Sequence, residues 1–350
     1  MASSFISSTS TAVMISILLC FTAFSLQRAA AGRGAAAIGG SYGGVEGVPA
    51  AYLFGDSLGD VGNNNYLLTY MKADFAHNGI DFAGGRATGR FSNGKNSADF
   101  ILKHHHYRKR LTFEEKHSQD ECLSFNKQID YFSTAYAAMV EQVGNDQAQH
   151  HLANSIFAII IGSNDIFGYI SSSNKPTPQQ FVSSLITTLQ DQLQRIYNVG
   201  ARKFIFVGTG LVGCCPALRI KINSDDCDVV GNSVSDLYNQ AVSSLLQKMK
   251  SQLSDMNYSF FNSNLAFVDI LQRPSDYGFT EVKAACCGLG ELNAKVACTP
   301  ISAYCSNRKT YAFWDFYHPT EATAAILTDR IFNGAAPYVY PINAGQLASL

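Results

Sequence analysis

The sequence carries almost no net charge: 26 Lys and Arg residues face 27 Asp and Glu residues, for a formal net charge of −1. Proteins that bind nucleic acid through its phosphates show a basic excess, so this balance gives no electrostatic reason to expect such a partner. The spacings Cys-x-x-Cys and His-x-x-x-His are also missing. Because zinc sites draw their ligands from such spacings, we expect no metal site.

Long apolar runs are missing too, apart from residues 14–26. This run is shorter than the roughly 20 residues that cross a bilayer. Ala29-Ala30-Ala31 follows it with the small residues that signal peptidase prefers, although no basic residue precedes Arg28. We therefore expect residues 1–31 to be a cleaved signal peptide, with a membrane anchor as the alternative, and residues 32–48 to be a flexible, Gly- and Ala-rich leader. The mature chain is then secreted, without stable membrane insertion.

The rest of the sequence shows no internal repeat and no Pro/Ser-rich linker, so we expect residues 49–350 to form a single domain. Its cysteine number is even, which in an exported chain favours disulfides over buried free thiols. Their pairing is open, and they are Cys122, Cys214, Cys215, Cys227, Cys286, Cys287, Cys298 and Cys305. Asn257-Tyr258-Ser259 is a glycosylation sequon. The sequence gives no indication of an oligomeric state.

Short apolar runs alternate with long amphipathic segments. The runs are typical of strands buried on both faces of a parallel sheet, and they cover residues 50–54, 156–161, 204–207 and 265–270. The amphipathic segments predict helices over residues 123–143, 179–199, 234–256 and 320–332. For the second of these, Thr177 and Gln180 form a capping box and Gly200 can end the helix. Alternation of strand and helix predicts a doubly wound α/β sheet covered by helices on both faces.

Three segments carry chemistry at the ends of predicted strands or near the C-terminus: Phe54-Gly55-Asp56-Ser57, Gly162-Ser163-Asn164-Asp165 and Asp315-Phe316-Tyr317-His318-Pro319. In a parallel sheet, ligands bind beyond the carboxyl ends of the strands, so the first two segments can meet in one crevice. Taken alone, Gly-Ser-Asn-Asp would be an ordinary turn, and Asp-x-x-His would be a helix cap with an incidental histidine. Together they supply a nucleophile, an amide donor and an Asp/His pair, which a serine esterase needs for acyl transfer.

Each part has a chemical role. A serine hydroxyl needs a base to take its proton as it attacks, so Ser57 is the candidate nucleophile and His318 the candidate base. Asp315 can orient the imidazole and stabilise the imidazolium. The amide of Asn164 and the backbone N–H of Ser57 can donate hydrogen bonds to an oxyanion.

These segments resemble those of the plant GDSL esterase/lipase family, within the SGNH hydrolase superfamily. The first block extends as Phe54-Gly55-Asp56-Ser57-Leu58-Gly59-Asp60-Val61-Gly62-Asn63-Asn64-Asn65, and Ala87-Thr88-Gly89-Arg90-Phe91-Ser92-Asn93-Gly94-Lys95 resembles the stretch that follows it in plant members. The resemblance implies a three-layer α/β/α flavodoxin-like fold with a mostly parallel sheet. It also implies ester hydrolysis without metal or cofactor by Ser57, Asn164, Asp315 and His318, and a location in the apoplast or cell wall.

One family block is missing, however. In the family, a strand and an oxyanion-binding glycine precede a helix that resembles Lys127-Gln128-Ile129-Asp130-Tyr131. Here residues 103–121 stand in that place, with nine charged residues and four histidines and no strand pattern. They predict a solvated loop, with a metal-binding histidine cluster or a basic recognition patch as the alternative. We therefore expect a sheet that lacks one edge strand and a site that lacks one donor.

The sequence thus favours a secreted esterase or lipase that acts on a small-molecule or lipid ester. Two alternatives stay open. One is acyl transfer to a cell-wall or cuticle acceptor. The other is a catalytically impaired protein that binds the cell wall or lipid, because the glycine block is missing.

Overall fold

The computed structural model describes residues 48–103, 110–114 and 123–350. The expected signal peptide over residues 1–31 lies outside the described residues, as does all but the last residue of the leader over residues 32–48. Cys122 and most of residues 103–121 also lie outside them.

Six strands of the described chain form the central sheet: β1 (Ala51–Gly55), β2 (Arg110–Glu114), β3 (Ile156–Ile160), β4 (Lys203–Val207), β5 (Asn257–Phe261) and β10 (Val339–Pro341). Their order is β10-β5-β4-β3-β1-β2. All pairs are parallel except β10 with β5. The five parallel strands therefore follow the flavodoxin-like order 2-1-3-4-5, and the fold is of the expected α/β class with a mostly parallel sheet.

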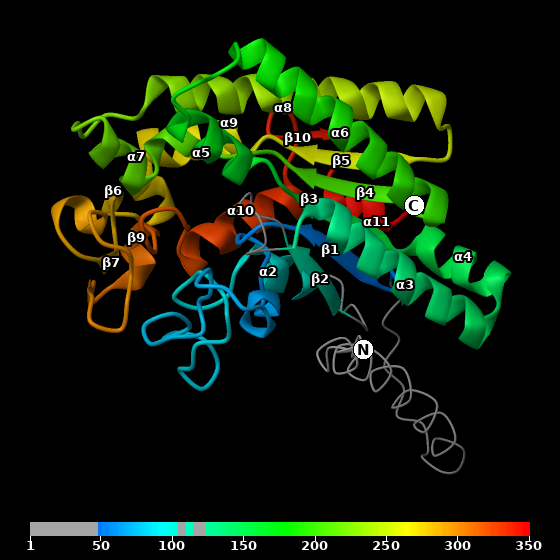
Figure 1. Cartoon of the computed structure of the whole chain (residues 1–350), viewed down its shortest axis with the longest axis horizontal. Helices are drawn as coiled ribbons and strands as arrows, with labels where there is room; N and C mark the ends of the chain where they lie inside the picture. Colours follow the sequence, from blue (N-terminus) through cyan, green and yellow to red (C-terminus); the bar gives the residue numbers. More distant parts are fainter. Residues whose placement is uncertain (1–47, 104–109, 115–122) are drawn as a thin grey trace, which may run out of the picture. The chain divides into compact units, whose positions relative to one another are not determined.

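Most of the helices lie on the two faces of this sheet (Figure 1). The helices of the described chain are α2 (Ser97–Lys103), α3 (Phe125–Val143), α4 (Asn145–Asn154), α5 (Ser163–Ser171), α6 (Pro178–Val199), α7 (Pro216–Lys221), α8 (Val229–Gln252), α9 (Ser263–Gln272), α10 (Glu321–Asn333) and α11 (Ala344–Ala348). Short 3₁₀ turns are η1 (Asn63–Tyr66), η2 (Val212–Cys214), η3 (Pro274–Tyr277), η4 (Glu291–Asn293) and η5 (Arg308–Thr310). Small two-stranded sheets pair β6 (Glu281–Ala285) with β9 (Tyr311–Phe313) and β7 (Cys287–Gly288) with β8 (Ala303–Tyr304).

Each strand supplies side chains to two cores in alternation, because successive side chains of a strand point to opposite faces. On β1, Tyr52 and Phe54 join the core under α3, α4, α5, α6 and α8. Ala51 and Leu53 join the core under α2, α9, α10 and α11. The predicted runs over residues 50–54, 156–161 and 204–207 are therefore strands covered on both faces, as expected.

The clearest sequence-predicted helix is confirmed as α6. The Thr177 side chain accepts a hydrogen bond from the Gln180 backbone N–H, and the capping box is complete. The helix ends at Gly200, where φ is 130°. Helices were also correctly predicted where α3, α8 and α10 lie, although α8 begins at Val229, five residues before the predicted start.

The predicted strand over residues 265–270 is wrong, since these residues belong to α9. A short apolar run fits a buried strand or a buried helix equally well, so its neighbours decide. The side chain of Asn262 accepts a hydrogen bond from the Leu265 backbone N–H and so caps a helix. The true fifth strand is β5, which precedes this cap.

The prediction that residues 103–121 contain no strand and that the sheet lacks one edge is also wrong. Residues Arg110–Glu114 form β2, which pairs with β1 in parallel from Ala51↔Arg110 to Gly55↔Glu114. The sequence of β2 alternates polar and apolar residues, but charged residues and histidines on both sides obscure that pattern. Charged residues are common on edge strands, where they discourage pairing with other chains. No glycine occurs in β2.

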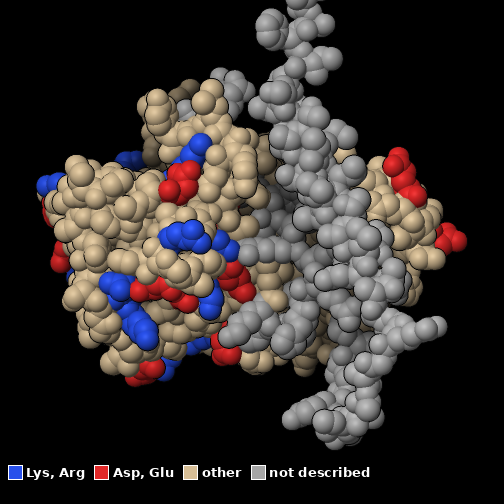
Figure 2. Space-filling view, turned by 90° about the horizontal axis from the view of Figure 1, so that it is seen from below, with Lys and Arg blue, Asp and Glu red and all other residues tan. Residues whose placement is uncertain are grey.

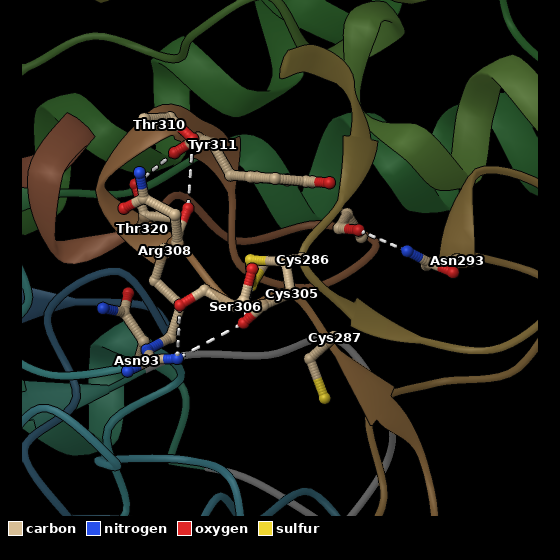
Figure 3. Close-up of a disulfide and its surroundings, with 12 residues drawn as sticks. Asn93, Cys286, Cys287, Asn293, Cys305, Ser306, Arg308, Thr310, Tyr311 and Thr320 are labelled. Atoms are coloured by element: carbon tan, nitrogen blue, oxygen red, sulfur yellow. Dashed lines mark hydrogen bonds between the residues drawn. A yellow bond between two sulfur atoms is a disulfide. The ribbon is translucent and has the colours of Figure 1, made fainter. Parts of the chain in front are cut away.

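Six of the cysteines form three disulfides: Cys214–Cys227, Cys286–Cys305 and Cys287–Cys298. Figure 3 shows Cys286–Cys305 beside Arg308, whose Nη1 donates hydrogen bonds to the carbonyl oxygens of Cys305 and Ser306. Cys215 is buried as a free thiol, so the expectation of disulfides holds for the other six described cysteines and fails for this one.

The surface seen in Figure 2 mixes charges of both signs, with Lys and Arg side chains lying among Asp and Glu side chains where residues are described. Within those same residues, no helix combines the length and the apolar character that crossing a bilayer requires.

Candidate active site

Ser57 lies in a tight turn directly after β1. The backbone N–H of Asp56 still donates to the carbonyl oxygen of Ile160 at 3.0 Å, which continues the pairing with β3. The Asp56 carboxylate then accepts a hydrogen bond from the Leu58 backbone N–H at 3.0 Å. At Gly55 a Cβ would lie 2.5 Å from the Ile160 carbonyl oxygen, so only glycine allows this approach of the two strand ends.

Gln128 of α3 holds the peptide that precedes this turn. Its Oε1 accepts from the Gly55 backbone N–H at 3.1 Å, and its Nε2 donates to the Gly55 carbonyl oxygen at 3.0 Å. Nε2 also donates to the Leu123 carbonyl oxygen at 3.0 Å. Gln128 is fully buried. A buried amide whose donors and acceptor are all hydrogen-bonded holds its partners in place. Gln128 therefore fixes the backbone of Gly55, from which the turn that carries Ser57 begins.

Asp315 and His318 face each other within one turn between β9 and α10. The Trp314 backbone N–H donates to the His318 carbonyl oxygen at 2.8 Å, which closes the turn. The imidazole Nδ1 lies 2.8 Å from both carboxylate oxygens of Asp315. The same carboxylate accepts the backbone N–H groups of Tyr317 at 2.9 Å and His318 at 2.8 Å. Thr320 caps α10 directly after the turn.

These two residues complete a hydrogen-bonded chain with Ser57, whose Oγ lies 2.7 Å from His318 Nε2. Asp315 and His318 are only 5% and 6% exposed. Burial alone would raise the pKa of the Asp315 carboxyl, but the neighbouring imidazole and the two backbone N–H groups outweigh it and lower that pKa. Asp315 is therefore an anion that holds the Nδ1–H tautomer of His318 and leaves Nε2 free to accept the Ser57 proton.

Asn164 is the second residue of α5, which begins where β3 ends. The N-cap of this helix, Gly162, has a φ of 116°, and a Cβ there would lie 2.6 Å from the ring of Tyr238. Both the left-handed backbone and the close ring require glycine. The resulting sharp turn places Asn164 on the wall of the same cavity as Ser57 and His318.

The cavity continues past these polar residues into an apolar interior. Its inner wall comes from the strand ends and from α9, β9 and α10, with Phe261, Phe267, Phe313, Leu327 and Ile331. Cys215 lies on the wall as well, and burial raises the pKa of its thiol to about 12. This thiol is therefore protonated and unsuited to nucleophilic attack near neutral pH. Ser57 and His318 therefore share one cavity with a largely apolar wall.

Within the described part of the chain, no three His, Cys, Asp or Glu side chains gather as metal ligands would.

The carboxyl group of Asp60 supports the loop after Ser57. Its Oδ1 accepts the backbone N–H groups of Gly62 at 2.5 Å and Asn63 at 2.7 Å. Asp60 is fully buried, and this burial raises its pKa from 3.8 to about 6, against the opposing effects of those N–H groups and of the nearby Arg90 charge.

This raised pKa makes the stability of the protein fall as pH rises. Between pH 3.8 and about 6 the folded state holds a proton that the unfolded state has lost, so the free energy of unfolding falls by about 3 kcal/mol. Asp60→Asn has no such proton but keeps an oxygen for both N–H groups. Urea unfolding measures the free energy of unfolding of the variant minus that of the wild type. We expect this difference to be about 3 kcal/mol larger at pH 7 than at pH 3.5. An equal difference at both pH values would contradict this account.

The structure brings together the residues that the sequence singled out. Ser57, His318 and Asp315 form one hydrogen-bonded chain, and Asn164 lines their cavity. No sequence pattern indicates a role for Gln128, or for Phe91, whose ring stacks on His318. Both lie in stretches that already resembled the family, and that was the only available signal. The apolar inner wall was missed because loops and helices far apart in the sequence build it.

Similarity to known proteins extends over most of the chain. A sequence model of a family described as GDSL-like Lipase/Acylhydrolase matches residues 52–331. Two GDSL esterases/lipases of Arabidopsis thaliana are 36% and 35% identical, covering 86% and 87% of this chain and 90% and 92% of their own length. A crystal structure described as that of a GDSL-like lipase from Parabacteroides merdae aligns with a TM-score of 0.38 at 13% identity, covering 80% of this chain and 93% of the other. So distant a structural likeness adds no weight.

Proposed function

Because the chain belongs to the GDSL-like lipase/acylhydrolase family, we propose that it is a secreted serine esterase that works through Ser57, His318 and Asp315. Family membership makes the chain a hydrolase that acts on esters. The finer assignment rests on one observation, the continuous chain of hydrogen bonds from Ser57 Oγ through the imidazole to Asp315.

In the first half of the reaction, Ser57 Oγ attacks the ester carbonyl carbon while its proton passes to His318 Nε2. The distance of 2.7 Å between these atoms is within the range for direct proton transfer. Asp315 stabilises the imidazolium that forms. The imidazolium then gives its proton to the leaving alcohol oxygen as the C–O bond breaks, and an acyl-serine results.

In the second half, water replaces the alcohol. His318 takes a proton from the water as the water oxygen attacks the acyl carbonyl carbon, and returns it to Ser57 Oγ as the acid leaves. No redox step and no cofactor enters this scheme. In each half, His318 acts first as a base and then as an acid.

Both tetrahedral intermediates carry negative charge on the former carbonyl oxygen. The Asn164 amide and the Ser57 backbone N–H are the donors that we assign to it, because both residues line the cavity next to His318. The family glycine that would supply a third donor is missing from the sequence, so more of the stabilisation depends on Asn164.

Asn164→Ala tests that dependence. We expect kcat to fall about 100- to 1,000-fold with a small change in KM, because the oxyanion donor acts in the transition state and not on the bound ester. Nitrophenyl ester turnover measures both constants. Asn154→Ala, at the end of α4, is a matched control that removes the same side chain away from the cavity. A loss confined to KM, or a loss of less than threefold in kcat, would remove Asn164 from this role.

The apolar inner wall supports an ester with an uncharged acyl group, from a small molecule or a lipid. The three disulfides support an oxidising compartment, and we extend this to the extracellular space, the apoplast or the cell wall. Immunodetection of the full chain in the extracellular fluid tests the location; retention in the cell would contradict it.

Product analysis separates hydrolysis from the two other possibilities. The purified protein is incubated with a nitrophenyl ester in water and then with a sugar or hydroxy-acid alcohol added. Hydrolysis gives free acid in both cases, whereas acyl transfer gives a new ester when the alcohol is present. If the folded protein forms neither product yet binds an acyl lipid or a wall polymer, it is an impaired binding protein and the proposed function fails.

A further inference from the structure

Phe91 lies against the face of the His318 imidazole. The two ring centroids are 4.8 Å apart and the ring planes meet at 30°, which is a stacked arrangement. His318 is buried, whereas Phe91 is only half-buried. The proposed reaction gives this ring no part. An aromatic ring in contact with the base of the reaction is nevertheless placed to affect every proton transfer that the base performs.

The backbone on both sides of Phe91 is held in place. Arg90 is buried and donates from Nε and Nη2 to the carboxylate oxygens of Asp99, at 2.6 and 2.8 Å. Its Nη1 donates to Thr88 Oγ1 at 2.7 Å. On the other side, the Ser92 carbonyl oxygen accepts the Gly79 backbone N–H at 2.9 Å. The ring of Phe91 is therefore carried by fixed chain and not by a free loop.

The same segment is joined to both catalytic turns. On the Ser57 side, Asn96 donates from Nδ2 to the carbonyl oxygen of Asp60. On the His318 side, Asn93 Oδ1 accepts the backbone N–H of Glu321, the first residue of α10, at 2.9 Å. Asn93 and Arg308 both donate hydrogen bonds to the carboxylate of Asp81. Figure 3 shows Asn93 beside Arg308. Segment 88–96 thus fixes Phe91 relative to the nucleophile and the base together.

We propose that Phe91 is a positioning residue that holds the His318 ring and favours its imidazolium form as Ser57 gives up its proton. The face of an aromatic ring carries partial negative charge and attracts a cation within about 6 Å. The imidazole acquires its positive charge only when the Oγ–H bond breaks and the Oγ–C bond forms. The attraction therefore acts on the transition state more than on the resting enzyme. This inference rests on the proposed esterase function.

Two variants test it against a control. Phe91→Leu removes the π face but keeps an apolar side chain, and we expect kcat to fall about tenfold, equal to about 1.4 kcal/mol, with KM changed less than twofold. Phe91→Tyr keeps the ring, and we expect it to retain at least half of the wild-type kcat. Phe82→Leu is the matched control, because Phe82 lies 4.4 Å from the Arg90 guanidinium and so supports the same segment. We expect its kcat to stay within twofold of wild type.

The outcomes are distinguishable. If wild type has no ester hydrolase activity, the proposed function fails. If wild type is active but Phe91→Leu and Phe91→Tyr have equal kcat, the ring has no special part and the inference is overturned. It is also overturned if Phe82→Leu loses as much kcat as Phe91→Leu, since a loosened segment then explains both. If the thermal unfolding midpoints of all three variants lie within 2 °C of wild type, the kcat changes are effects on the site. If only Phe91→Leu has a lower midpoint and its kcat is normal at low temperature, Phe91 serves stability, and the inference is overturned.

Discussion

Ser57→Ala is expected to lower kcat/KM for ester hydrolysis by a factor on the order of 10⁴ to 10⁶. The hydroxyl is the only group of this residue that bonds His318, and its removal leaves the imidazole and carboxylate in place without a nucleophile. Stability should change by less than about 0.5 kcal/mol, because Ser57 is half-exposed and one hydroxyl is a small loss. Nitrophenyl ester turnover and thermal unfolding measure the two effects.

Ser97→Ala is the matched control for this variant. Ser97 is another serine on the wall of the same cavity, at the start of α2, and it takes no part in the hydrogen-bonded chain. We expect it to retain most of the wild-type activity. If Ser57→Ala stays within tenfold of wild type, or if both serine variants lose the same activity, Ser57 is not the nucleophile.

Asp315→Asn is expected to lower kcat by about 10⁴-fold. The carboxylate accepts from Nδ1 at 2.8 Å, whereas an asparagine can turn its NH₂ group toward that nitrogen. The imidazole then carries its proton on Nε2, where it cannot accept the proton of Ser57. The wrong tautomer and the lost anion both act on the chemical step.

The size of the KM change separates this effect from a disturbed pocket. Asp315 lies on the far side of the imidazole from Ser57, so we expect KM to change less than about threefold while kcat collapses. Asp236→Asn, an exposed residue of α8, controls for the loss of one negative charge. A kcat for Asp315→Asn above a tenth of the wild-type value would show that orientation by Asp315 is not needed.

The sequence predicted most of the parallel sheet because its central strands are buried on both faces. β1, β3 and β4 each contain a short apolar run, which is typical of such strands. β5 was missed because its sequence, Asn-Tyr-Ser-Phe-Phe, mixes polar and aromatic residues, while the more uniformly apolar run that follows is part of the capped helix α9. Edge strand β2 was missed because pairing on one side leaves it free to carry charge.

The candidate site was predictable where local spacing carries the chemistry. Asp315 and His318 are three residues apart, and one turn brings them together. The contact of Ser57 with His318 spans 261 positions, and only the order of the sheet creates it. Disulfide pairing was out of reach, because eight cysteines allow 105 pairings and two adjacent pairs, Cys214-Cys215 and Cys286-Cys287, leave no spacing rule to choose among them.

The most direct test of the esterase assignment is labelling of the purified chain with a fluorophosphonate, followed by mass spectrometry of the modified peptide. The probe forms a phosphonyl–oxygen bond with a serine that a base activates, and fluoride leaves. We predict one adduct, on Ser57, that is lost in His318→Ala even though this variant keeps the serine. Unlabelled Ser57 in protein that thermal unfolding shows to be folded, or an adduct on another serine, would contradict it.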